Sequence, residues 1–348
     1  MCRPHAAPHR PDDLSRLRVE PASRHGSEVR RAARLCVIVV KLPVLLKASL
    51  DSAITRLTAS QVPSPRLNAE LLLMFTLDCD RAYLFAHPER ELSAEEQSRY
   101  DAALGERARG VPAQYITGHQ EFWGMDLIVT PAVLIPRPET EHVVETVLAL
   151  QGSLPGVGRP AFGPRTSAVR VSESRKADAG CRVLDVGTGS GCIALAFARE
   201  LPDAEMHATD ISTAALEVAR ANAARHQLEN RIQFHRADLL AGLNLTDLDF
   251  VVSNLPYVGE SEEDQVQLEV RKFEPRNAVF GGPTGTEVIA RLIPQAHAAL
   301  RPGGWFILEI SGTIADRVKQ LLQDWEEVRI IPDLQSIPRV VQARKPKI

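Results

Sequence analysis

The chain of 348 residues is 44% hydrophobic and 24% charged, which is the composition of an ordinary globular protein long enough for two domains. Its formal net charge is only −3, so no global field favours nucleic acid or a membrane surface as a partner. The five cysteines lack metal-ligand spacing, which predicts reduced thiols in a cytosolic compartment and no structural metal. No segment reaches the roughly 18 apolar residues of a transmembrane helix.

Residues 1–46 are interpreted as an extension outside any domain. Eight arginines within the first 34 residues resemble a transit peptide, but acids are interspersed among them, at Asp12, Asp13, Glu20 and Glu28. Transit peptides avoid acids, so we expect a disordered segment or a start codon placed too early. The expected location is the bacterial cytoplasm, with the mitochondrial matrix as the alternative.

Residues 47–120 are predicted to form a small helical domain. Ser64 is a candidate N-cap before Pro65 and predicts a helix over 66–77, with an apolar stripe at Leu67, Leu71, Met74 and Phe75. Ser93 and Glu96 have the spacing of a capping box and predict a second helix, which runs towards Gly110.

Residues 121–180 are predicted to link this domain to the rest of the chain. The pattern over 122–129 is strand-like with a bend near Trp123 and Gly124, and a helix is expected over 139–150. Residues 152–180 are rich in Gly, Pro, Ser and Arg without periodicity, which indicates a long mobile insertion.

Residues 181–348 alternate between strand and helix patterns, which indicates an α/β fold, a mostly parallel sheet with helices on both faces. Strands are expected at 182–186, 205–209, 231–235, 249–253, 305–310, 328–331 and 339–343, and helices at 192–200 and 213–224.

A glycine-rich turn, Gly187-Thr188-Gly189-Ser190-Gly191, follows the first of these strands. Open α/β sheets bind ligands at the carboxyl ends of their strands, so the turn is a candidate ligand site. Cys192 stands where a dinucleotide fingerprint needs its third glycine, which disfavours a dehydrogenase. The alternative is a tight strand-to-helix connection without a ligand.

Acidic residues end three successive strands, at Asp185, Asp210 and Asp238. Asp210 is placed to accept both hydroxyls of a ribose, and Asp238 is expected near an adenine amino group. Together the acids suit a cationic, ribose-bearing ligand without a pyrophosphate. The alternative for each is a helix cap or a turn residue.

The fourth strand is followed by Asn254-Leu255-Pro256-Tyr257. The Asn254 side-chain oxygen and a nearby main-chain carbonyl can hold both N–H groups of a planar amide or amine, which orients its nitrogen towards a methyl donor and stabilises the positive charge that develops. Tyr257 can pack on the planar group. The alternative is a simple proline turn.

Three upstream segments narrow this chemistry: GVPAQYITG at 110–118, EFWG at 121–124 and LIPRPETE at 134–141. With FEPRNA at 273–278 and LEI at 308–310, the chain resembles the PrmC/HemK family, the protein-(glutamine-N5) methyltransferases that modify peptide chain release factors. The resemblance covers roughly residues 47–345, and both the extension and the insertion over 152–180 lie outside it.

The resemblance implies a class I S-adenosylmethionine-dependent methyltransferase, with a seven-stranded, Rossmann-like sheet over 181–348 and a helical domain that docks the release factor. The implied substrate is the glutamine of the Gly-Gly-Gln loop. The implied cofactor residues are Gly187, Thr188, Gly189, Ser190, Gly191, Asp210, Asp238, Leu239 and Asn254. The implied catalytic and substrate-binding residues are Asn254, Leu255, Pro256 and Tyr257.

Two residues depart from the family pattern. Leu255 replaces the first proline of the usual Asn-Pro-Pro-Tyr, which predicts a less rigid loop and equal or higher activity for Leu255→Pro. Leu239 stands where relatives are often aromatic, which predicts weaker stacking on adenine.

Other functions stay open on the sequence alone. They are a methyltransferase for a ribosomal-protein glutamine, a DNA or rRNA amine methyltransferase, and a binding protein that lost catalysis through Leu255. The near-neutral charge disfavours direct nucleic-acid binding, and we expect a monomer that does not bind membranes.

Overall fold

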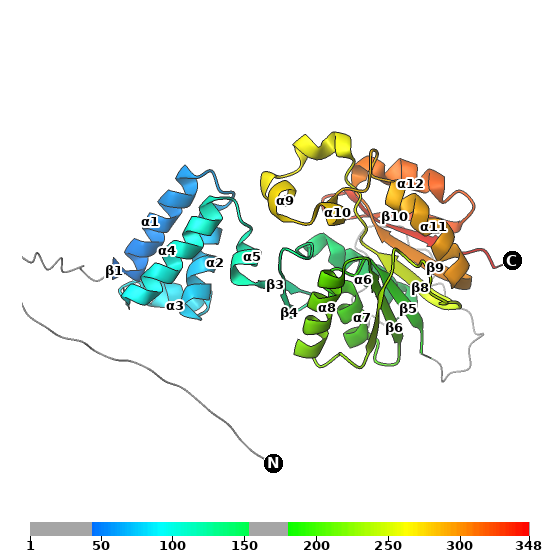
Figure 1. Ribbon diagram of the computed structural model, residues 1–348, viewed down its shortest axis with the longest axis horizontal. Coiled ribbons are helices and arrows are strands. Elements are labelled where there is room, and N and C mark those ends of the chain that lie inside the picture. Colours follow the sequence, from blue (N-terminus) through cyan, green and yellow to red (C-terminus); the bar gives the residue numbers. More distant parts are fainter. Residues whose placement is uncertain (1–43, 153–179, 348) are drawn as a thin grey trace, which may run out of the picture. The chain divides into compact units, whose positions relative to one another are not determined.

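The computed structural model describes residues 44–152 and 180–347 (Figure 1). Most of the predicted extension over 1–46 and nearly all of the predicted insertion over 152–180 therefore lie outside the described residues. Within the described ranges, no helix is both long and apolar enough to cross a membrane.

The amino-terminal part is a bundle of short helices closed by a two-stranded antiparallel ribbon. The helices are α1 (Leu46–Ala59), α2 (Pro65–Leu77), α3 (Arg81–Ala86), α4 (Ala94–Ala108) and α5 (Ala113–Thr117), and the ribbon pairs β1 (Val44–Leu45) with β2 (Glu91–Leu92). The predicted capping box of α4 is confirmed. The Glu96 amide donates to Ser93 Oγ at 3.1 Å, and the Ser93 amide donates to Glu96 Oε2 at 2.9 Å.

The predicted apolar face of α2 is partly wrong, because Leu71 and Met74 pack half-buried against the core of the bundle but the other two residues do not. Leu67 and Phe75 are 56% and 50% exposed, and the buried face carries Ala69, Leu72, Leu73 and Thr76. Because α2 is apolar nearly all round, periodicity alone did not choose between its faces. The small Ala69 lets α4 approach closely, and its carbonyl accepts the Tyr100 hydroxyl at 2.9 Å. The predicted N-cap position at Ser64 with Pro65 in the first turn is confirmed, but the Ser64 side chain makes no cap hydrogen bond and its φ is +48°.

A β-hairpin follows, formed by β3 (His119–Phe122) and β4 (Met125–Ile128) with its turn at Trp123 and Gly124. The buried Asn222 of α8 (Thr213–Arg225) holds this hairpin. Its Oδ1 accepts the Ile128 amide at 2.7 Å, and its Nδ2 donates at 2.9 Å to the carbonyls of Ile128 and Ser190. One side chain therefore ties the hairpin to the glycine-rich turn.

The predicted α/β fold is confirmed by a seven-stranded sheet of order β10-β11-β9-β8-β5-β6-β7, in which β11 runs opposite to the other six described strands. Its strands are β5 (Arg182–Val186), β6 (Glu205–Asp210), β7 (Ile232–Arg236), β8 (Leu248–Ser253), β9 (Leu300–Glu309), β10 (Glu326–Pro332) and β11 (Pro338–Arg344). Six of them match the expected strands to within two residues at each end, and β9 begins five residues earlier than expected.

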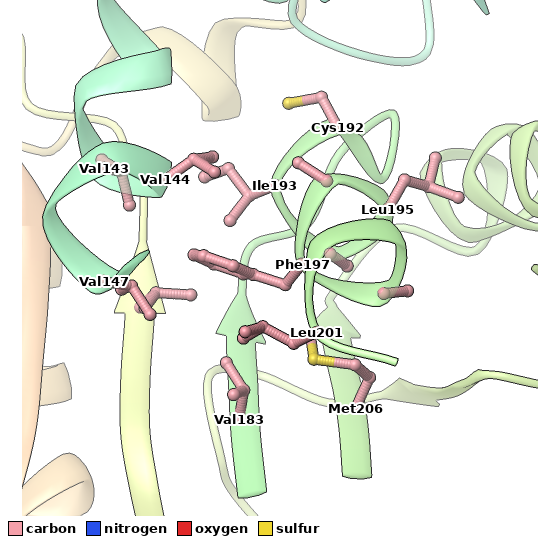
Figure 2. Close-up of a cluster of buried hydrophobic side chains, with 14 of the residues drawn as sticks. Val143, Val144, Val147, Val183, Cys192, Ile193, Leu195, Phe197, Leu201 and Met206 are labelled. Atoms are coloured by element: carbon pink, nitrogen blue, oxygen red, sulfur yellow. The ribbon is translucent and has the colours of Figure 1, made fainter. Parts of the chain in front are cut away.

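Each strand alternates its side chains between two apolar layers, because successive residues point to opposite faces. Val183 belongs to the layer covered by α6 (Glu141–Gln151) and α7 (Cys192–Glu200), whereas Leu184 belongs to the layer under α11 (Glu287–Ala299) and α12 (Ala315–Leu321). Figure 2 shows Val144 of α6 beside Ile193 of α7, and Val147 of α6 near the ring of Phe197, in the first layer.

The remaining described elements are short. η1 (Pro138–Thr140) precedes α6, η2 (Glu260–Gln265), α9 (Leu268–Phe273) and α10 (Arg276–Val279) follow β8, and η3 (Gly312–Ile314) follows β9. β5 pairs with the next strand, β6, on one side and with the later strand β8 on the other. The carboxyl end of β5 is therefore the switch point at which open α/β sheets form a crevice.

Candidate active site

A cavity of about 310 Å³ lies at this switch point and is in the size range of small-molecule sites. It brings together most of the predicted site residues: Gly187, Thr188, Gly189, Ser190, Asp210, Asp238, Leu239, Asn254, Leu255 and Pro256. Gly191 and Tyr257 do not line it. In the part of the chain that is described, no group of three or more His, Cys, Asp or Glu residues is placed to hold a metal ion.

Glycine is needed at Gly189 and at Gly191 of the turn for different structural reasons. Gly189 has a φ of +56° and open space where a Cβ would stand. Its backbone is therefore accessible to a ligand in the cavity. Gly191 has a φ of +85°, and a Cβ there would lie 3.2 Å from the Cβ of Ala219. Gly191 thus allows α7 to pack closely on α8, which explains why it does not line the cavity.

Asp210, at the end of β6, anchors the turn with both carboxylate oxygens. Oδ2 accepts the Gly189 amide at 2.9 Å and Oδ1 accepts the Ser212 amide at 2.8 Å. Burial raises the pKa of the carboxyl, although these amides oppose the shift. Each carboxylate oxygen can accept a further hydrogen bond, so Asp210 can still bind a diol in the cavity.

Asp185 does not face the cavity, and the expectation that three strand-end acids share a ligand is wrong for this residue. It is fully buried beneath the turn and accepts the Thr188 hydroxyl at 2.6 Å. Burial raises the pKa of Asp185 to about 7. Its role in the structure is to hold the turn from below.

Asp238 lies on the cavity wall next to Leu239. Arg291 of α11 also lines the wall and donates to Asp238 Oδ2 at 2.5 Å. Leu239 is buried and has a φ of +56°, a backbone conformation that is uncommon outside glycine. Sequence reasoning missed Arg291, because its helix lies more than fifty residues beyond Asp238.

Asn254 follows β8 and is oriented by a residue far away in the chain. Its Nδ2 donates to Thr140 Oγ1 at 3.1 Å. Because the amide nitrogen is engaged, the amide oxygen is the atom that Asn254 can offer to the cavity. Tyr257 points elsewhere, and its hydroxyl donates to Glu309 Oε1 at 3.1 Å. Both partners, Thr140 and Glu309, are 1% exposed and were not predicted to take part in the site.

Leu255 is 4% exposed and packs in the apolar layer under α11. Its Cδ2 lies 3.2 Å from the position a Cβ would take on Gly187. The side chain therefore supports the glycine turn as well as the tetrapeptide.

Leu255→Ala is expected to lower the free energy of unfolding by about 2–4 kcal/mol, because it leaves a cavity in this layer. Urea unfolding followed by circular dichroism measures the change. A loss below about 0.5 kcal/mol would show that the turn does not depend on this packing. The expectation for Leu255→Pro remains equal or higher activity, now with some loss of stability from the same missing contacts.

Another part of the cavity wall is held by an ion pair whose carboxylate is buried and whose guanidinium is 34% exposed. Arg137, which lines the cavity, donates to Glu274 Oε1, and the Ile135 amide donates to Glu274 Oε2 at 3.1 Å. The Glu274 side chain is 1% exposed. Burial raises its pKa, and Arg137 opposes that shift. The pair joins the segment before η1 to the segment between α9 and α10.

Arg137→Ala is expected to destabilise the protein by about 3 kcal/mol at pH 8, because an uncompensated buried carboxylate remains. Without Arg137 the folded-state pKa of Glu274 rises further above its unfolded value. The protein then loses stability as the pH rises through that folded pKa and keeps it below the unfolded value. Unfolding at pH 5 and pH 8 tests this, and an equal loss at both would contradict it.

Two family models match the chain. The PrmC N-terminal domain matches residues 48–118, and the methyltransferase small domain matches residues 167–272.

This chain covers nearly the whole length of the curated relatives named here. A release factor glutamine methyltransferase of Koribacter versatilis is 53% identical over 302 residues, 86% of this chain and 99% of the relative. One of Moorella thermoacetica is 40% identical over 83% of this chain and 94% of the relative.

Solved structures give weaker likenesses. The hMettl16 catalytic domain has a TM-score of 0.47 at 14% identity, over 75% of this chain and 85% of that one. The ribosomal protein L11 methylase from Lactobacillus delbrueckii subsp. bulgaricus has a TM-score of 0.39 at 20% identity, over 63% and 84%.

Proposed function

Because this chain belongs to the release factor glutamine methyltransferase family, we propose that it methylates N5 of the glutamine in the Gly-Gly-Gln motif of class I peptide chain release factors, with S-adenosylmethionine as the donor. The observation that carries the proposal is the orientation of the Asn254 side-chain amide. Its amide nitrogen is held by Thr140 at 3.1 Å, which leaves an oxygen to accept an N–H group beside the glycine turn.

The residues of the cavity fit S-adenosylmethionine. The Gly187–Gly191 turn has a bare backbone at Gly189 for the amino-acid end, and Asp210 has acceptors for the ribose hydroxyls. Asp238 and Leu239 lie on the wall assigned to adenine. The ligand carries a sulfonium cation, and the Asp210 carboxylate brings a negative charge to the site, whereas the charge of Asp238 is balanced by Arg291.

When bound, the cofactor supplies an electrophilic methyl group. The protein's task is to bring a poor nucleophile, the planar glutamine amide, to that methyl group in the right orientation. Asn254 Oδ1 and the main-chain carbonyl of Leu255 accept the two N–H groups, which directs the nitrogen at the methyl group. The same two oxygens would stabilise the positive charge that develops on the amide nitrogen during methyl transfer. The surplus proton then leaves to water.

The helical domain is assigned to docking of the release factor. It exposes large apolar side chains, with Leu67 at 56%, Phe75 at 50% and Phe85 at 57% exposure. Exposed apolar groups of this size are typical of protein contact surfaces. Arg81 stacks on Phe85 and adds a positive charge beside one of them.

The test is methylation of purified full-length release factors with labelled S-adenosylmethionine, followed by mass spectrometry of the Gly-Gly-Gln peptide. We expect one added methyl group on the glutamine. A release factor in which that glutamine is replaced by alanine is the control and should remain unlabelled. Label on ribosomal protein, rRNA or DNA, with none on the release factor, would replace this proposal by one of the alternative substrates.

A further inference from the structure

Arg107 is a buried arginine of α4 that the proposed chemistry does not use. Its side chain is 4% exposed, and arginine is buried to this extent almost only when it is paired. Within the helical domain, Nε donates to Asn68 Oδ1 at 2.7 Å and Nη1 donates to the Val111 carbonyl at 3.1 Å. Nη2 lies 2.7 Å from Glu269 Oε2 of α9. The ion pair of Arg107 therefore crosses from the helical domain to the catalytic part of the chain (119–152 and 180–347).

Glu269 belongs to a loop, residues 258–280, that begins directly after the tetrapeptide and contains η2, α9 and α10. The two ends of this loop pair with each other through an isolated parallel bridge. Farther along the loop, Glu274 makes the ion pair with Arg137 at the cavity wall. The loop is thus held at its ends beside the tetrapeptide, at Glu274 to the cavity wall, and at Glu269 to the helical domain.

α5 makes the other connection between the helical domain and the catalytic part, which belong to one compact unit of the chain. Ile116 packs against the core of the helical bundle, whereas the Tyr115 hydroxyl donates at 2.6 Å to the carbonyl of Val133 in the catalytic part. A domain held by one such connection is free to swing about it. A second contact, made by Arg107 and Glu269 on other elements, limits that freedom.

The rigidity of this link matters for a large substrate. A release factor bound to the helical domain presents its glutamine to the cavity as an intramolecular partner, and the effective concentration of that glutamine depends on how the link spans the two sites. A swinging domain spreads the glutamine over many positions, and few of them place its amide nitrogen in line with the methyl donor. A short peptide that reaches the cavity by itself does not need the link.

We propose that Arg107 and Glu269 are positioning residues that lock the helical domain onto the loop, so that a docked release factor presents its glutamine at Asn254. The proposal rests on the proposed function for the identity of the docked protein. The lock itself is a property of the free enzyme and can be measured without any substrate.

Burial makes this pair more than a surface contact. An exposed ion pair contributes little, because water screens it and two long side chains must be ordered. Here all three guanidinium nitrogens of Arg107 are engaged, and the Glu269 side chain is only 24% exposed. Removal of the carboxylate leaves a buried charge without its counter-ion. Arg107 then gains by turning towards water, and the contact between the two parts opens.

The decisive variant is Glu269→Ala in the full chain, assayed on a full-length release factor and on a short peptide that contains Gly-Gly-Gln. With saturating release factor, the single-turnover rate should fall about 10-fold or more. The Kd for the release factor should stay within about threefold, because the docking side chains of α2 and α3 are untouched. With the peptide, kcat/KM should stay within about twofold of the wild type. Glu269→Gln, whose amide oxygen can still accept from Arg107, should keep most of the rate.

Asp264→Asn is the matched control. Asp264 is an acid of the same loop and pairs with Arg271 at 3.0 Å, but both partners lie within the loop and the Asp264 side chain is fully exposed. We expect wild-type rates with both substrates. An unchanged rate of Glu269→Ala on the release factor would overturn the proposal. An equal fall with the peptide would also overturn it, because the effect would then lie in the cavity itself.

The lock is read in the free enzyme by small-angle X-ray scattering. The radius of gyration should increase in Glu269→Ala, as the helical domain samples more positions, and should not change in Asp264→Asn. Unchanged scattering of Glu269→Ala is a further result that the proposal does not survive. If the wild type methylates neither the release factor nor the peptide, the proposed function fails, while the scattering still decides whether the pair holds the domain.

Discussion

Asn254→Ala is expected to lower the kcat for release-factor methylation by about 100-fold or more, because it removes a preorganised acceptor of the reacting amide. The Kd for S-adenosylmethionine should change by less than about threefold, since the glycine turn and Asp210 remain. Single-turnover kinetics with labelled cofactor measure the first quantity, and calorimetry measures the second.

The control for this prediction is Asn230→Ala. Asn230 is exposed and does not line the cavity, so its variant should behave as the wild type does. If Asn254→Ala lost cofactor binding and rate in parallel, Asn254 would be part of the cofactor site rather than the holder of the glutamine.

Asp210→Ala is expected to affect mainly the binding of the cofactor. Charge-assisted hydrogen bonds contribute about 1.5–3 kcal/mol each, so the Kd for S-adenosylmethionine should rise by about 10- to 100-fold. Part of this rise comes from the Gly189 amide, which loses its acceptor at 2.9 Å. Calorimetric titration measures the Kd, and Glu217→Gln, an exposed change on α8 away from the cavity, is the control.

The same carboxyl gives cofactor binding a pH dependence. Burial raises the pKa of Asp210, and only the ionised form can accept both ribose hydroxyls. As the pH falls through this raised pKa, the carboxyl takes up a proton and the Kd should rise, at a higher pH than an ordinary aspartate would require. A Kd for Asp210→Ala that stayed at the wild-type value would remove Asp210 from the cofactor site.

The catalytic fold was predictable because its signals are local. Each strand is a short apolar run, and the change from strand to helix pattern recurs along 181–348. The glycine turn, Asp210 and the tetrapeptide follow strand ends, so the rule for open α/β sheets was enough to bring them together at one crevice.

What escaped prediction depends on contacts between distant segments. The buried face of α2 is chosen by the surface that α4 presents, through Tyr100 and Ala69. The depth of Asp185 depends on how the turn folds back over it through Thr188. The links from Asn254 to Thr140 and from Tyr257 to Glu309 span 114 and 52 residues of sequence. The register of β8 against β9 brings Glu309 beside the tetrapeptide, and the packing of α6 on these strands brings Thr140 there.

Asn222 has a consequence for the timing of motions in this molecule. Its single amide bonds the hairpin at Ile128 and the glycine turn at Ser190. Opening of the hairpin breaks two of the Asn222 hydrogen bonds and opening of the turn breaks one, and each leaves a polar atom of a buried side chain without its partner. Local opening of either segment therefore has an added free-energy cost, which makes the motion of both rarer.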